Sequence, residues 1–134
     1  MKPRSRLDFR PAPMRSSRAR EAAVTFRTVR AIGLRIPGAE ESTMYGAPAL
    51  KIGGHMFACI ASHSSAERNT LAVRMDFAQR DALVAEDPDT YYLKDHYVNY
   101  PCVLVRLSRV HEDAMRDLLA GAARFVKNAK GAKR

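Results

Sequence analysis

Two periods of hydrophobic residues alternate along the 134-residue chain, and they predict which segments are helices and which are strands. Apolar residues from Phe26 to Ile36 recur at steps of three and four, so residues 21–35 are predicted to form an amphipathic helix that Pro37-Gly38 ends. A second helix is predicted over residues 112–126. Its apolar stripe consists of Met115, Leu118, Leu119, Ala122, Phe125 and Val126.

A hairpin is predicted around Gly53-Gly54. Residues 49–52 and 55–61 favour strands, and two glycines between them supply the positive φ angles of a two-residue turn. The expected pairs are Ile52 with His55, Leu50 with Phe57, and Pro48 with Cys59. In this register the core face carries Leu50, Ile52, Phe57 and Cys59.

Two further strands alternate clearly. Residues 70–75 are expected to point Leu71, Val73 and Met75 inward, and residues 102–109 to point Val103, Val105 and Leu107 inward. Asp76, with Gln79 three residues later, predicts a helix that runs through residue 85. Residues 42–45 are expected to form a short strand, and residues 90–101 a short strand followed by an ordered loop.

The order of these elements indicates an α+β fold. We expect a twisted, mostly antiparallel sheet of four or five strands, with a short inserted helix and with the N- and C-terminal helices packed on one face.

The net charge of +9 is unevenly distributed. Residues 1–20 contain seven Lys and Arg and one acid, and residues 127–134 contain four Lys and Arg, whereas residues 36–126 hold nine Lys and Arg against twelve Asp and Glu. We therefore expect a domain at 21–126 between a basic N-terminal tail at 1–20, which is shorter if Met14 is the start, and a basic C-terminal tail at 127–134. Such tails attract polyanions weakly and in a salt-dependent way.

Several functional classes are not expected. No apolar run reaches the 18 to 20 or so residues of a membrane span, and the N-terminus lacks the apolar region of a secretory signal, so a cytoplasmic protein without membrane contact is predicted. Two cysteines and four histidines without ligand spacing predict no metal, and Gly53-Gly54 lacks the residues of a phosphate loop, so no cofactor is expected. Glu40-Glu41 is interpreted as a charged turn. His63 among serines lacks an orienting group, so no catalytic residue is assigned and a non-enzymatic protein is predicted.

An ordered series of motifs carries a family resemblance over residues 24–126. The segments "IPGAEESTMYGAPALKIGGHMFACIA", "LAVRMD" and "DPDTYYLKDHYVNYPCVLVRL", with the closing amphipathic helix, resemble the MmcQ/YjbR family. This resemblance implies a fold like that of frataxin or secretion chaperones, and a double-wing mode of DNA binding.

Candidate DNA contacts follow from this resemblance and from the strand pattern. The face opposite the helices is expected to carry Lys51, Arg74 and Arg106 among Ala49, Met56, Ala58 and Leu104, while Arg68, Lys94 and His96 lie in loops. Such cations can contact phosphates, or they can simply keep the sheet soluble. Tyr91, Tyr92, Tyr97 and Tyr100 are candidates to stack on bases or line a small pocket, with packing on the core as the alternative.

Two hypotheses therefore stay open. The first is a DNA-binding module that works through phosphate contacts, for which residues 21–126 alone should bind duplex DNA and alanine at Lys51, Arg74 and Arg106 should weaken binding. The second is a module that binds a protein or a small ligand, with a chaperone-like fold.

Overall fold

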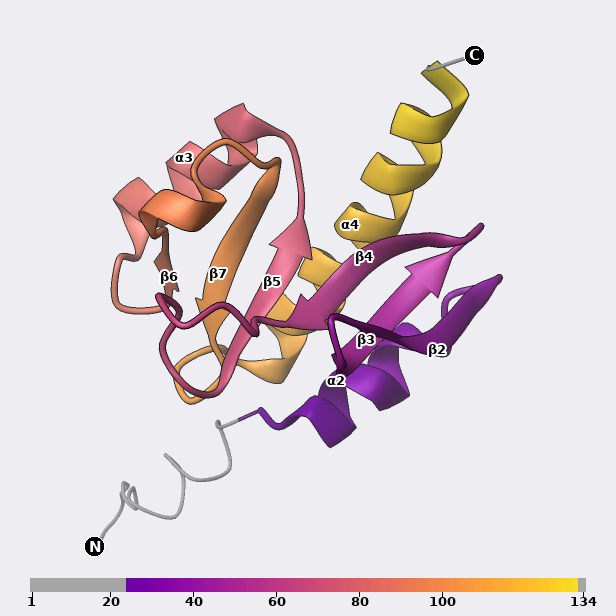
Figure 1. Ribbon diagram of the computed structural model, residues 1–134, viewed down its shortest axis with the longest axis horizontal. Coiled ribbons are helices and arrows are strands. Elements are labelled where there is room, and N and C mark those ends of the chain that lie inside the picture. Colours follow the sequence, from indigo (N-terminus) through magenta and orange to yellow (C-terminus); the bar gives the residue numbers. More distant parts are fainter. Residues whose placement is uncertain (1–23, 133–134) are drawn as a thin grey trace, which may run out of the picture.

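The computed structural model describes residues 24–132 (Figure 1). The predicted N-terminal tail and the start of the helix predicted at 21–35 lie outside the described residues. In chain order the elements are α2 (Phe26–Gly33), β2 (Ala39–Met44), β3 (Ala47–Ile52), β4 (His55–Ile60), β5 (Thr70–Arg74), α3 (Phe77–Glu86), β6 (Tyr91–Tyr92), the 3-10 helix η1 (Asp95–Tyr97), β7 (Cys102–Arg106) and α4 (Glu112–Ala132).

The strands form one antiparallel sheet of six strands in the order β2-β3-β4-β5-β7-β6. Helices α2 and α4 lie together behind this sheet in Figure 1, so they cover one of its faces. The α+β fold and the placement of the terminal helices on one face are confirmed. None of the helices in residues 24–132 is both long and apolar enough to cross a bilayer.

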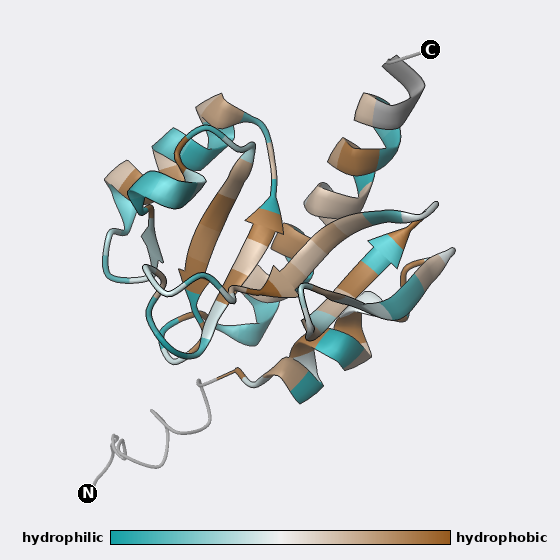
Figure 2. Ribbon diagram, viewed as in Figure 1, coloured by the Kyte–Doolittle hydropathy of each residue, from teal (hydrophilic) through white to brown (hydrophobic). Residues whose placement is uncertain are grey.

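The main core lies between the sheet and these helices. The alternation in β5 and β7 turns Leu71, Val73, Val103 and Val105 toward the helices, as predicted, and all four are fully buried. Figure 2 shows the hydrophobic colouring running along these two central strands. Each such buried aliphatic side chain stabilises the fold by about 1.5–3 kcal/mol relative to an exposed one.

The β3–β4 hairpin has the predicted turn but a different register. Gly53 and Gly54 have φ angles of 57° and 81°, and Ile52 pairs with His55 as expected. The register then shifts, so that Leu50 pairs with Ala58 and Ala49 with Cys59. Phe57 is the extra residue of a β-bulge, which turns the rest of the strand by one position.

This bulge corrects four expectations. The pairs Leu50–Phe57 and Pro48–Cys59 are wrong, because Phe57 and Ala58 both contact the helix-side core. Cys59 therefore lies on the opposite face of the sheet, which we call the outer face, and Ala58 does not.

Helices α2 and α4 have other bounds than predicted, whereas α3 begins where predicted. Helix α2 begins after Thr25, whose hydroxyl accepts a hydrogen bond from the Thr28 amide, and it ends at Gly33. Helix α3 begins at the predicted cap, since Asp76 accepts from the Gln79 amide at 2.7 Å. Helix α4 continues to Ala132, six residues past the predicted end, because no helix breaker follows its apolar stripe.

Candidate functional site: a pocket on the outer sheet face

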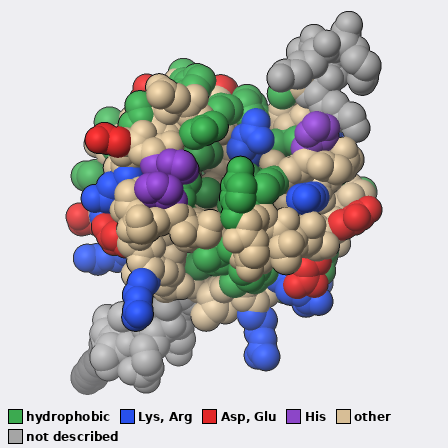
Figure 3. Space-filling model, in the orientation of Figure 1, with side chains coloured by type: hydrophobic (Ala, Val, Ile, Leu, Met, Phe, Trp, Pro, Cys, Tyr) green, Lys and Arg blue, Asp and Glu red, His purple; other side chains and the backbone are tan. Residues whose placement is uncertain are grey.

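The outer face of the sheet carries a second apolar cluster instead of an open basic surface. Its buried members are Ala49, Cys59, Ala72, Tyr92 and Leu104. Two of these side chains, Cys59 and Ala72, are small and line a pocket of about 750 Å³. Figure 3 shows hydrophobic side chains in the middle of this face, with Lys, Arg and His side chains around them.

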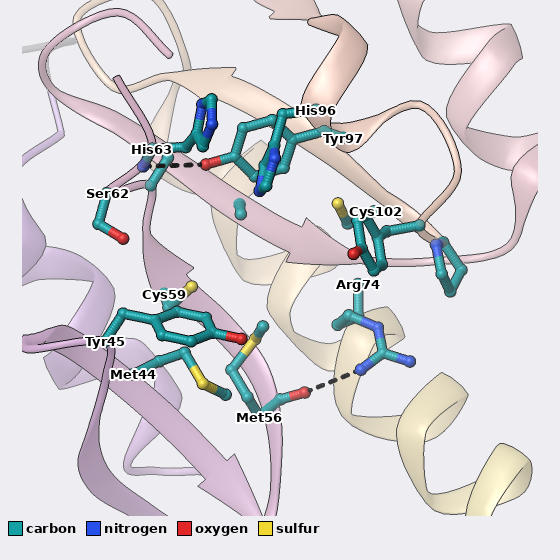
Figure 4. Close-up of a pocket in the computed structure, with 14 residues that line it drawn as sticks. Met44, Tyr45, Met56, Cys59, Ser62, His63, Arg74, His96, Tyr97 and Cys102 are labelled. Carbon is teal, nitrogen blue, oxygen red and sulfur yellow. Dashed lines mark hydrogen bonds between the residues drawn. The ribbon is translucent and has the colours of Figure 1, made fainter. Parts of the chain in front are cut away.

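The pocket has a floor and two walls (Figure 4). Cys59, Ala72 and Cys102 belong to the floor, which the central strands β4, β5 and β7 supply. Met44 and Tyr45 from the β2–β3 hairpin form one wall. The other wall comes from two loops and consists of His63, His96, Tyr97 and Tyr100.

Ring contacts hold this second wall together. The rings of His63 and His96 stack with centroids 3.7 Å apart and 11° between their planes. Tyr97 packs edge-on against His96 at 4.9 Å, and its hydroxyl accepts a hydrogen bond from the His63 amide. Burial of Tyr97 raises the pKa of its hydroxyl, which therefore stays protonated at neutral pH. The loops at 61–69 and 93–101 thus form one surface.

A contact between Ser65 and His63 was not expected from the sequence. The Nδ1 atom of His63 lies 2.8 Å from Ser65 Oγ and accepts a hydrogen bond from the Ser65 amide at 3.0 Å. An Nδ1 atom that accepts from an amide carries no proton, so the proton of the neutral ring is on Nε2. The contact spans two residues and closes a local turn, which fixes the ring for stacking.

Arg106, one of the predicted DNA contacts, lies on the outer face with its donors occupied. Its Nε and Nη2 atoms donate to the Glu67 carboxylate at 2.8 and 2.6 Å, and Nη1 donates to the carbonyls of Pro88 and Asp89. These hydrogen bonds lower the pKa of Glu67 and raise that of Arg106. Arg106 also lies 4.2 Å from the centroid of the Tyr92 ring. Its guanidinium therefore holds the loop at 61–69 and the turn before β6 to the sheet.

Arg74, a second predicted contact, has a different environment. It is the only Lys, Arg, Asp or Glu among the described residues that line the pocket. Its Nη1 donates one long hydrogen bond of 3.5 Å to the Met56 carbonyl, and its guanidinium lies 5.7 Å from the Phe125 ring. Its Nε atom is buried without a hydrogen-bond partner. Most of the donors of this side chain are therefore unused.

The remaining predicted contacts are dispersed. Arg68, Lys94 and His96 are exposed on the two loops, and Lys51 is partly exposed on β3. The tyrosines separate as well. Tyr91 packs into the helix-side core, Tyr92 belongs to the outer cluster, and Tyr97 and Tyr100 line the pocket. Tyr91 and Tyr92 are therefore packed against apolar clusters, whereas Tyr97 and Tyr100 lie where a ligand could contact them. A role for any of the four in stacking on bases stays a prediction.

A buried arginine that was not predicted to matter positions the loop at 93–101, which contains Tyr97 and Tyr100 and which we call the tyrosine loop. Arg80 on α3 donates to the carbonyls of Val98 and Tyr100 at 2.8 and 3.2 Å, and it lies 4.6 Å from the Phe77 ring. The signal in the sequence is its helical spacing from Leu83 and Val84, which places a cation on the apolar face of the helix.

The two thiols of the pocket floor are unreactive at neutral pH. Burial raises the pKa of Cys59 to about 11 and that of Cys102 to about 11. Both are therefore protonated and poor nucleophiles. Within residues 24–132, no group of three or more His, Cys, Asp or Glu side chains is arranged to hold a metal ion.

Comparisons with known proteins agree with this architecture. Residues 34–122 match the YjbR family model. A search of curated proteins finds no match. Among solved structures, the crystal structure of Deinococcus radiodurans protein DR2400, which has a DUF419 domain, is similar to this chain. Its TM-score is 0.60 and its sequence identity 19%, and the match covers 76% of this chain and 77% of that one.

Proposed function

The chain belongs to the YjbR family, and from the geometry of its outer face we propose that it is a non-catalytic module that binds a small ligand in the pocket. The observation that carries this proposal is the pocket itself. Its volume of about 750 Å³ lies within the range of sites for small molecules, which are mostly apolar and contain a few placed polar groups.

The side chains of the pocket favour binding over catalysis. The thiols are protonated, and the Nδ1 atom of His63 is engaged by its own turn. A protein with two buried, unpaired thiols is suited to a reducing compartment, so we extend the proposal to a cytoplasmic location.

Filling the pocket tests this function. Ala72 lies in the floor and is 4% exposed, so Ala72→Phe places a ring inside the cavity. The control is Ala82→Phe, at an exposed position of α3. The probe is the neutral fluorophore N-phenyl-1-naphthylamine, titrated into the full chain. We expect saturable binding that Ala72→Phe weakens by at least about tenfold, a loss of about 1.4 kcal/mol, and that Ala82→Phe leaves unchanged. Equal binding by both variants, or absence of saturable binding of this fluorophore and of naphthalene-based anions and amides, contradicts the proposal.

DNA binding is the second candidate, and the exposed loop cations favour it. Arg68 and Lys94 are exposed on two loops that contact each other, which is compatible with the wing contacts implied by the family resemblance. However, residues 24–132 contain fourteen Lys and Arg against twelve Asp and Glu, a net charge of only +2 out of +9 for the chain. Most of the attraction to phosphates is therefore expected from the terminal segments.

A salt titration separates these contributions. Fluorescence anisotropy with a labelled DNA duplex is measured for the full chain and for the double variant Arg68→Ala, Lys94→Ala. If both side chains contact phosphates, the slope of log K against log salt concentration falls by about two. Arg27→Ala on α2, across the sheet, is the control. An unchanged slope in the double variant excludes the loop contacts.

A further inference from the structure

The pocket combines one cation that makes few hydrogen bonds, Arg74, with aromatic side chains on both walls. The chemistry of a suitable ligand follows from this combination. Among the described residues that line it there is no carboxylate, so the positive charge of Arg74 has no negative partner among them. The Nε donor is buried without a partner, and the Nη atoms make only one long hydrogen bond, to the Met56 carbonyl. An anionic ligand group would therefore bind the Nη atoms through charge-assisted hydrogen bonds.

Tyr45 provides the first aromatic wall, and its backbone is strained. Tyr45 and Gly46 form the two-residue turn between β2 and β3, with φ angles of 53° and 79°. Asn-Gly is the favoured pair in such a turn, and a bulky residue at positive φ is unfavourable there. The Tyr45 ring is nevertheless 90% exposed and lines the pocket, so it contributes little to the fold.

The opposite wall presents further rings. In Figure 4 the stacked His63 and His96 lie across the pocket from Tyr45, with Cys59 between the two sides. Two aromatic walls above an apolar floor suit a flat ring system, which can stack on either wall while it covers the small side chains beneath.

We propose that this pocket binds planar aromatic monoanions, with the ring between Tyr45 and the His63–His96 wall and the anionic group at Arg74. The inference rests on the proposed ligand-binding function and specifies its ligand class.

The matched probes are three small molecules that differ in one property each. 2-Naphthoate is aromatic and anionic, 2-naphthamide is aromatic and neutral, and decalin-2-carboxylate is anionic with a saturated ring system in place of the flat aromatic one. Each is titrated into the full chain and followed by amide chemical shifts. We expect 2-naphthoate to bind at least about tenfold more tightly than 2-naphthamide, because the amide carbonyl can accept from Arg74 but brings no negative charge to it. We expect decalin-2-carboxylate to bind about fivefold more weakly than 2-naphthoate.

Two variants assign these effects to residues. Arg74→Met should reduce the affinity for 2-naphthoate to that for 2-naphthamide, while Arg27→Met, across the sheet, changes neither. Tyr45→Asn should raise the unfolding temperature, because asparagine tolerates positive φ. The same variant should bind 2-naphthoate about fivefold more weakly, because it lacks the ring of the first wall. Opposite changes in stability and binding from one substitution are not expected of a merely structural residue.

The outcomes are distinct. If naphthoate and naphthamide bind within about twofold of each other, or decalin-2-carboxylate binds as well as naphthoate, the ligand class is wrong while the binding function stands. If no probe binds, including N-phenyl-1-naphthylamine, the proposed function fails too. The comparison of probes needs only the wild-type chain, so it decides even if Arg74→Met does not fold.

Discussion

The rings of His63 and His96 lie face to face, although 33 positions separate them in the sequence. The contact joins the loop after β4 to η1 and so completes one wall of the pocket. Both side chains are exposed, and the contact between them is the stacking of their rings.

Removing one ring of this stack is expected to loosen the loop that contains His63. An aromatic pair contributes about 0.5–1.5 kcal/mol beyond its buried area, so His96→Ala should speed amide hydrogen exchange in residues 61–69 by about two- to tenfold. His96→Phe retains a flat ring and serves as the control. Equal exchange rates in both variants would mean that stacking does not order the loop.

The Tyr92 hydroxyl is expected to contribute measurably to stability. It accepts a hydrogen bond from the Glu67 amide at 2.8 Å and lies 2.7 Å from the hydroxyl of Thr70, which is fully buried. Tyr92→Phe leaves both groups without this partner, so we expect the free energy of unfolding in urea to fall by about 1–3 kcal/mol. Tyr100→Phe, at a ring that is 56% exposed, should change it by less than about 0.5 kcal/mol.

Two glycines in helices should respond to alanine in opposite directions. A Cβ atom at Gly33 would lie 2.4 Å from Leu50 Cδ1, and Leu50 is fully buried, so Gly33→Ala should destabilise the fold by about 1–3 kcal/mol. At Gly121 in α4 the nearest contact would be Arg124 Nη2 at 3.8 Å. Gly121→Ala should therefore stabilise by about 0.5–1 kcal/mol through helix propensity. Thermal unfolding of both variants tests the sign, and destabilisation by Gly121→Ala would contradict this reasoning.

The sequence predicts the elements well where one local signal decides them. Alternation places the inward side chains of β5 and β7, Asp76 marks the start of α3, and Gly53-Gly54 marks the hairpin turn. These signals act over a few residues, so no knowledge of the tertiary packing is needed.

The register of β4 could not be predicted in this way. Whether Phe57 forms a bulge depends on how it and Ala58 pack against the helices. That single shift moves Cys59 to the outer face, and so decides part of the pocket floor. The Tyr45-Gly46 turn was also missed, because tyrosine is not a residue that indicates positive φ.

The pocket was predicted only in outline. The tyrosine loop was a candidate for a small pocket, but the other wall and the floor come from four strands. Small side chains such as Cys59 and Ala72 carry no local signal that a pocket lies above them. Of the predicted cations, Arg74 and Arg106 belong to strands of the sheet, whereas Arg68 and Lys94 lie on loops. Whether any of them contacts DNA stays a prediction.

Alkaline pH is expected to destabilise the protein through its two thiols. Burial raises the pKa of both Cys59 and Cys102 to about 11 in the folded state, from 9.0 for an exposed thiol. A raised pKa means that the fold favours the protonated form. The corresponding stability is complete below pH 9 and is lost as the pH rises toward 11. The burial of Tyr91 and Tyr97 raises their pKa values and acts in the same direction.

Replacing the thiols isolates their share of this effect. In Cys59→Ala and Cys102→Ala the fall in unfolding free energy between pH 8 and pH 11 should be smaller than in the wild type, by an amount on the order of 2 kcal/mol for each thiol. Urea unfolding at several pH values measures this difference. The tyrosines are present in every variant, so their contribution is the same in all of them.

Alkylation by iodoacetamide tests the same protonation independently, because only the thiolate reacts. At pH 8 both thiols should react far more slowly in the folded protein than in urea, and a bound pocket ligand should slow Cys59 further. Equal alkylation rates in folded and unfolded protein, or parallel pH profiles for wild type and variants, would show that burial does not hold these thiols protonated.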